Sequence, residues 1–103
     1  MGFFSFLFGG ESIKEALKKG AVIIDVRTAA EFDNGKVPGS VNIPVDRISI
    51  NAGRIKLMNK PVVVCCASGA RSSQAKEILK KAGIKEVYNG GSWQSVLKQW
   101  NAL

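Results

Sequence analysis

The feature that most constrains the fold is a continuous apolar run over residues 61–65, which leads directly into the loop Cys66 to Ser72. An unbroken apolar run of this length predicts a strand that is covered on both faces. Beyond the loop, apolar residues spaced i, i+3, i+4, i+7 predict a helix over 72–82. A buried strand is therefore followed by a cysteine at the start of a short, glycine-containing loop, and a helix begins where this loop ends.

The rest of the chain alternates between helix-like and strand-like stretches over short links. Capping boxes at Ser12-x-x-Glu15 and Thr28-x-x-Glu31 predict two helix starts, and Ser92 is predicted to cap a last helix. Strands are predicted over 21–26, 41–44, 62–65 and 86–88, and a weak helix over 45–50, while the stretch 51–60 is left unassigned. This order predicts an α/β fold with a central, mostly parallel sheet of four to five strands and helices on both faces.

The amino-acid composition excludes several kinds of catalytic site. A chain of 103 residues with 46% hydrophobic content predicts one soluble globular domain. It contains no histidine, which excludes Ser/His/Asp triads, Cys–His dyads and zinc sites that use histidine. Any nucleophile must therefore be activated by electrostatics alone.

The two cysteines, Cys65 and Cys66, are adjacent. Neighbouring cysteines do not form a disulfide framework, so we expect free thiols in a reducing, cytoplasmic location, with neither metal nor cofactor. Alternation along the strand directs the two side chains to opposite faces, and Cys65 is predicted to lie in the core.

The formal net charge is +7. Most lysines fall on what are predicted to be solvent faces of helices, so we expect a basic surface that attracts small anionic substrates and no nucleic-acid partner. Phe3, Phe4, Phe6 and Phe8 crowd the amino terminus in a run too short to span a membrane. We expect this segment to pack on the domain, with weak membrane or partner contact as the alternative.

The loop that follows the buried strand is the candidate site. Convergent amides, the helix start and the guanidinium of Arg71 all favour a negative sulfur, so we expect a lowered pKa for Cys66. The alternative is that Cys66 is a small buried apolar residue. Short loops are expected to leave this cysteine accessible. The candidate site residues are Cys66 as nucleophile and the loop residues Ala67, Ser68, Gly69, Ala70, Arg71 and Ser72.

Other side chains have simpler interpretations. Gly69 is expected to serve backbone conformation, and the hydroxyls of Ser68 and Ser72 either bind an anion or form a turn and an N-cap. Asp25 and Arg27 are interpreted as a charge pair at a strand end, with Glu31 as a further member. Trp93 and Trp100 are expected in the core.

Three stretches, in order, resemble the signatures of one family: Ile24-Asp25-Val26-Arg27 with Glu31-Phe32 and the run Gly35 to Pro44, then Cys66 to Ser72, then Tyr88-Asn89-Gly90-Gly91-Ser92-Trp93. The chain resembles the rhodanese-like sulfurtransferases. The resemblance implies a domain over 12–103, preceded by a phenylalanine-rich segment over 1–11, in which Cys66 carries sulfur as a persulfide. Lys36 stands where the family usually has histidine, and the phenylalanine-rich segment replaces its first strand.

The resemblance implies a sulfurtransferase that takes sulfane sulfur from thiosulfate or a persulfide donor. The acceptor is cyanide, a small thiol or a protein thiol. One alternative is a non-catalytic sulfur carrier or binding module. The other is a cysteine phosphatase or arsenate reductase, which is disfavoured because only four residues separate Cys66 from Arg71. Phosphatases of this kind also need a general acid, and no aspartate is evident near the loop.

Overall fold

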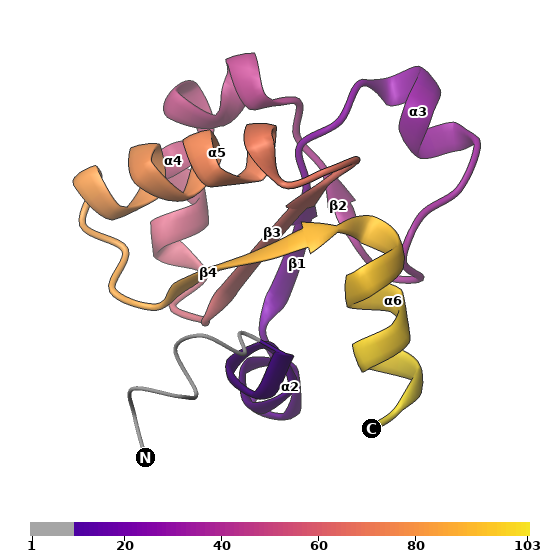
Figure 1. Cartoon of the computed structure of the whole chain (residues 1–103). Helices are drawn as coiled ribbons and strands as arrows, with labels where there is room; N and C mark the ends of the chain where they lie inside the picture. The colour runs from indigo at the N-terminus through magenta and orange to yellow at the C-terminus, as the bar shows by residue number, and fades with distance from the viewer. Residues whose placement is uncertain (1–9) are drawn as a thin grey trace.

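The structure is a computed structural model that describes residues 10–103, and a parallel sheet forms its centre (Figure 1). The four strands are β1 (Val22–Asp25), β2 (Val41–Asn42), β3 (Val62–Cys66) and β4 (Val87–Ser92). They are hydrogen-bonded in the order β2-β1-β3-β4, and all three pairings are parallel. The predicted α/β class and the predicted parallel sheet are confirmed.

Helices cover both faces of this sheet, as predicted (Figure 1). Helices α4 (Ile48–Leu57) and α5 (Ala70–Lys81) pack on one face, and α2 (Gly10–Lys18) and α6 (Trp93–Asn101) pack on the other. The short helix α3 (Ala29–Asp33) and the 3-10 turn η1 (Val45–Arg47) belong to the links that follow β1 and β2. None of the helices in the described residues is long and apolar enough to cross a membrane.

The alternation of side chains along β3 creates two separate cores. Val62, Val64 and Cys66 lie in the core that α4 and α5 cover, whereas Val63 and Cys65 lie in the core that α2 and α6 cover. All five residues are at most 1% exposed. The prediction that Cys65 is a core residue on the opposite face from Cys66 is therefore confirmed.

Several predicted boundaries differ from the structure. Helix α2 begins at Gly10, so Ser12 lies inside its first turn and does not cap it. Strand β2 covers only Val41–Asn42, and β4 continues to Ser92 through an irregular register opposite Val64 and Cys66. By contrast, Thr28 caps α3 through a complete capping box with Glu31, and Ser92 caps α6, as predicted.

Packing explains one stretch left unassigned and one wrong prediction. Helix α4 begins within the weak helix predicted over 45–50 and occupies most of the unassigned stretch 51–60, because Ile48, Ala52 and Ile55 at i, i+4, i+7 spacing are buried in the core that α5 shares. Trp100 is 40% exposed and does not lie in the core. The predictions for Phe3, Phe4, Phe6 and Phe8 and for a boundary after residue 11 concern a segment that lies largely outside the described residues.

Candidate active site

The candidate site lies where β3 ends and α5 begins. Gly69 is the N-cap of α5 and has φ of +106°, a left-handed conformation that favours glycine, so its predicted conformational role is confirmed. The carbonyl of Gly69 accepts a hydrogen bond from the amide of Ser73 at 3.0 Å, which closes the first turn. The loop therefore folds back over the end of β3, with the amides of the helix start directed towards Cys66.

The sulfur of Cys66 is surrounded by hydrogen-bond donors. The amide of Gly69 donates to Sγ at 2.9 Å and the amide of Ser72 at 3.4 Å, and the Ser72 hydroxyl lies 3.4 Å away. Burial alone raises the pKa of the Cys66 thiol. Hydrogen bonds from the Ser72 hydroxyl and from the amides of Ser72, Gly69 and Ser68 outweigh burial, so the pKa falls below its ordinary value.

The neighbouring Cys65 has the opposite electrostatic environment. Burial in the apolar core, aided by the nearby carboxylate of Asp25, raises the pKa of the Cys65 thiol to about 12. Of the two adjacent thiols, only Cys66 therefore has a surrounding that favours the thiolate.

Access to the sulfur is narrower than predicted. Cys66 is only 1% exposed, so the prediction of an accessible cysteine is wrong. The loop folds over the side chain, and a donor molecule must reach Sγ through the ring of amides that stabilises its charge. A reactant must therefore present a small or narrow group to the sulfur.

Ser72 has a larger role at the site than the sequence indicated. It is not an N-cap, because α5 begins at Ala70. Its hydroxyl lies 2.6 Å from Oδ1 of Asn89 and 3.1 Å from the carbonyl of Gly69. Asn89 also donates from Nδ2 to the Gly69 carbonyl at 3.3 Å and accepts from the amide of Gly91 at 2.9 Å.

Asn89 is thus a site residue that sequence reasoning missed. It lies in the stretch 88–93, which carries the family resemblance, but no role was assigned to it. The available signal was its position before Gly90-Gly91 at the carboxyl end of a strand, where ligand sites of parallel sheets form.

The guanidinium of Arg71, which was expected to favour a negative sulfur, forms an ion pair with Glu31. It donates to both carboxylate oxygens of Glu31, at 2.7 and 3.0 Å. The hydrogen bonds from Arg71 and from Thr28 hold the pKa of Glu31 at about 2. This ion pair connects the loop to α3, so Arg71 helps to hold the loop in position. Ala67, Ser68 and Ala70 form the exposed rim.

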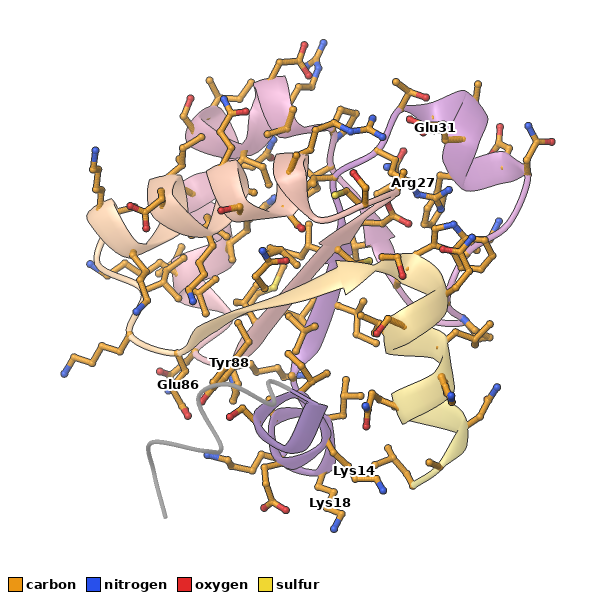
Figure 2. All side chains as sticks on the ribbon, in the orientation of Figure 1. Lys14, Lys18, Arg27, Glu31, Glu86 and Tyr88 are labelled. Carbon is orange, nitrogen blue, oxygen red and sulfur yellow. The ribbon has the colours of Figure 1, made fainter. Side chains whose placement is uncertain are left out.

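A second charged pair joins Arg27 and Asp25, and Figure 2 shows Arg27 below Glu31 of α3. The Arg27 side chain is buried and donates to both carboxylate oxygens of Asp25, with Nε–Oδ1 at 2.9 Å and Nη2–Oδ2 at 2.7 Å. It also donates to the backbone carbonyls of Glu31 and Gly35, and its guanidinium lies 5.0 Å from the ring centroid of Trp93. The structural interpretation of Asp25 and Arg27 fits these contacts, while the Glu31 carboxylate pairs with Arg71 instead.

Comparison with known proteins shows the family to which the chain belongs. Residues 10–99 match the model of the rhodanese-like domain family. The chain is 35% identical over 74 residues to the thiosulfate sulfurtransferase PspE of Escherichia coli K12, covering 71% of each chain. It is 36% identical over 67 residues to the putative sulfur carrier protein YrkF of Bacillus subtilis, covering 65% of this chain and 36% of that protein.

A solved structure described as a rhodanese with anions from E. coli is 34% identical, with a TM-score of 0.67 over 73% of this chain and 89% of that chain. The chain spans between 36% and 62% of the length of three of the curated relatives that it matches. An α/β domain with a cysteine cradled by amides at the carboxyl end of a central strand defines the class. The chain belongs to the rhodanese-like family.

Proposed function

We propose that the protein is a sulfurtransferase that moves sulfane sulfur from thiosulfate or a persulfide donor to a thiophilic acceptor through a persulfide on Cys66. The observation that carries this proposal is the environment of Sγ, where the Gly69 and Ser72 amides and the Ser72 hydroxyl lie within 3.4 Å. A thiolate held by such donors attacks soft electrophiles without a general base, which suits a chain that has no histidine.

The first half-reaction forms one sulfur–sulfur bond and breaks another. The Cys66 thiolate attacks the outer sulfur of thiosulfate, the bond between the two thiosulfate sulfurs breaks, and sulfite leaves with the bonding electrons. The outer sulfur of the new persulfide carries the negative charge within the amide ring. A thiophilic acceptor then attacks that outer sulfur and restores the Cys66 thiolate, which predicts ping-pong kinetics.

The test is a thiosulfate and cyanide assay combined with intact mass measurement. The wild-type protein should gain one sulfur, about 32 Da, after thiosulfate treatment and lose it to cyanide. Cys66→Ser should do neither, whereas the matched variant Cys65→Ala should retain both, because the Cys65 thiol is buried with a pKa of about 12. A wild-type protein that never gains sulfur would contradict the proposal.

A sulfur carrier is the second candidate, because the chain is 36% identical over 67 residues to a putative sulfur carrier protein of Bacillus subtilis. A carrier would gain the same mass with thiosulfate but would show no turnover with cyanide. The phosphatase alternative has little support. Glu31, whose carboxylate binds the loop arginine, has a pKa of about 2 and is therefore ionised, so it has no proton to give a leaving group.

A further inference from the structure

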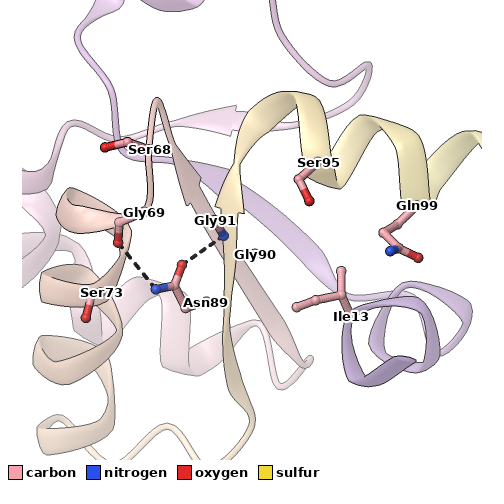
Figure 3. Close-up of a pocket in the computed structure, with 9 residues that line it drawn as sticks. All are labelled: Ile13, Ser68, Gly69, Ser73, Asn89, Gly90, Gly91, Ser95 and Gln99. Atoms are coloured by element: carbon pink, nitrogen blue, oxygen red, sulfur yellow. Dashed lines mark hydrogen bonds between the residues drawn. The ribbon is translucent and has the colours of Figure 1, made fainter. Parts of the chain in front are cut away.

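Two adjoining cavities lie along β4, which is one of the two edge strands of the sheet within the described residues. The first, of about 480 Å³, begins at Ser68 and Gly69 of the loop and runs between α5 and α6 (Figure 3). The second, of about 360 Å³, continues towards the start of β4, and both are lined by Ile13 and Asn89. We call the two cavities together the β4 groove.

The two ends of the β4 groove differ in chemistry. The end near the loop is lined by small and neutral polar residues, among them Ser73, Gly91 and Ser95. The far end is lined by three lysines: Lys76, Lys80 and Lys85.

The positive charge of the far end is not neutralised within the described residues. No ion pair joins these three lysines to any residue of 12–103. Glu86 also lines this end, but its carboxylate accepts from Lys19 and from the Tyr88 hydroxyl, both at 3.1 Å, and Figure 2 shows Glu86 and Tyr88 together there. A ligand with carboxylates at one end and a neutral stretch at the other matches this distribution.

We propose that the β4 groove binds an extended acidic segment of a protein sulfur acceptor, with the acceptor thiol placed at the Ser68–Gly69 end. The proposal rests on the proposed sulfurtransferase function and adds the class of acceptor. Gly69 lines the groove, and its amide donates to Sγ of Cys66 at 2.9 Å. A thiol at that end therefore arrives beside the loop that holds the persulfide.

The length of the groove sets the spacing within the segment. Gly69, the N-cap of α5, and Lys76, the first of the three lysines along the chain, lie seven residues apart, which corresponds to ~10 Å of helix rise. An extended chain spans that distance with about three residues. The acidic residues should therefore be separated from the reactive cysteine by about three small, neutral residues.

The transfer step is balanced without an additional oxidant. The acceptor thiolate attacks the outer sulfur of the Cys66 persulfide, a bond forms between the acceptor sulfur and the outer sulfur, and the bond from the outer sulfur to Sγ breaks. The acceptor leaves as a persulfide, and Cys66 regains its thiolate within the amide ring.

A nucleic acid fits this groove less well than a peptide does. Single-stranded nucleic acid is bound by cations along the whole backbone together with aromatic stacking surfaces. The half of the groove near the loop is lined by no lysine or arginine, and the Tyr88 ring at the far end is partly buried against the core that α2 and α6 cover. An oligonucleotide is therefore an alternative occupant for the test to distinguish.

The experiment uses the full chain and a synthetic peptide, Asp-Glu-Asp-Gly-Ser-Gly-Cys, with Asn-Gln-Asn-Gly-Ser-Gly-Cys as the neutral control. The wild-type protein is loaded with thiosulfate, and loss of the added sulfur to each peptide is followed by mass. At low salt, we expect transfer to the acidic peptide to be about tenfold faster than to the neutral peptide. The combined variant Lys76→Gln, Lys80→Gln, Lys85→Gln should abolish that preference.

A matched variant controls for net charge. Arg54→Gln, Lys56→Gln, Lys60→Gln removes the same charge from residues that line neither cavity, and it should retain the preference. Equal transfer to both peptides, or a preference that survives loss of the three groove lysines, would overturn the proposal. Discharge by cyanide should be equal in all variants, which shows that the chemistry at Cys66 is intact.

A binding measurement keeps this test separate from the proposed function. A fluorescent acidic peptide whose cysteine is replaced by serine should bind the unloaded wild-type protein, and its binding should be lost in the groove variant alone. This result is expected even if thiosulfate never loads Cys66, in which case only the proposed function fails. Absence of peptide binding would overturn the groove proposal. An oligonucleotide that displaces the fluorescent peptide at a lower concentration than unlabelled acidic peptide does would also overturn it.

Discussion

The hydroxyl of Ser72 lies 2.6 Å from Oδ1 of Asn89 and 3.4 Å from Sγ of Cys66. A hydroxyl has one proton, so Ser72 can donate to the amide oxygen or to the sulfur, but not to both at once. When the proton is directed to Asn89, the Cys66 thiol can donate to the Ser72 oxygen. When Cys66 ionises, the hydroxyl stabilises the thiolate by turning to it. Asn89 therefore competes with the sulfur for this proton.

This competition predicts opposite effects from two substitutions. Ser72→Ala should raise the pKa of Cys66 by about one unit, since a hydrogen bond to a charged group contributes ~1.5 kcal/mol. Asn89→Ala should lower that pKa, because the Ser72 proton then has one acceptor fewer. In the Ser72→Ala background, Asn89→Ala should change nothing. The pH dependence of Cys66 alkylation measures the pKa in all three variants. If Asn89→Ala lowers the pKa equally in the Ser72→Ala background, Asn89 acts by a route that does not involve Ser72.

The lowered pKa of Cys66 also predicts how sulfur loading depends on pH. The loading rate should rise with pH and reach half of its plateau below the pH at which N-acetylcysteine, measured in parallel, is half ionised. The Cys65→Ala variant should give the same curve, because the Cys65 thiol has a pKa of about 12 and remains protonated throughout. A curve that coincides with that of the free thiol would mean that the amides around Sγ do not stabilise its charge.

The ion pair between Glu31 and Arg71 predicts a loss of stability in acid. The folded protein holds the pKa of Glu31 at about 2, below its ordinary value of 4.5, so the stabilisation is complete above 4.5 and is lost as the pH falls towards 2. Glu31→Gln should remove part of this pH dependence of the free energy of unfolding, measured by urea denaturation. Glu77→Gln, which removes an exposed glutamate of α5 that forms no ion pair within residues 12–103, should retain it.

Local sequence signals predicted the parts of this structure that local interactions determine. The Thr28 capping box, the Ser92 cap and the alternation of Cys65 and Cys66 each depend on residues within a few positions, and each is found as predicted. The signal for helix α4 was weaker. Its buried residues Ile48, Ala52 and Ile55 have helical spacing, but Ile50, which is 74% exposed, breaks the pattern, and only packing against the core shared with α5 shows which face is buried.

The candidate site also combines features that local sequence determines with contacts between residues far apart in the chain. The cysteine, its loop and Gly69 follow from their order along the chain. The partners that orient them come from distant positions: Glu31 lies 40 residues before Arg71, and Asn89 lies 17 residues after Ser72. No periodicity connects residues so far apart. Sequence reasoning therefore identified the sulfur and its amides but did not predict that the guanidinium of Arg71 pairs with Glu31.

Two glycines provide a test of packing at the strand that carries Asn89. A Cβ added at Gly90 would collide with Cγ2 of Val96 and lie 3.0 Å from Cγ1 of Val63, so α6 approaches β4 closely only because this residue is glycine. Gly90→Ala should lower the free energy of unfolding by about 1–3 kcal/mol, as overpacking of a core does.

Gly53 is the matched control, because it lies within helix α4 with nothing within 4 Å of an added Cβ. Gly53→Ala should raise the free energy of unfolding by about 0.5–1 kcal/mol, since alanine loses less backbone entropy than glycine when a helix forms. Urea denaturation of the two variants beside the wild type measures both effects. A Gly90→Ala variant as stable as the wild type would mean that α6 can move away from β4 at no cost in free energy. The close packing of α6 on β4 would then not depend on glycine at this position.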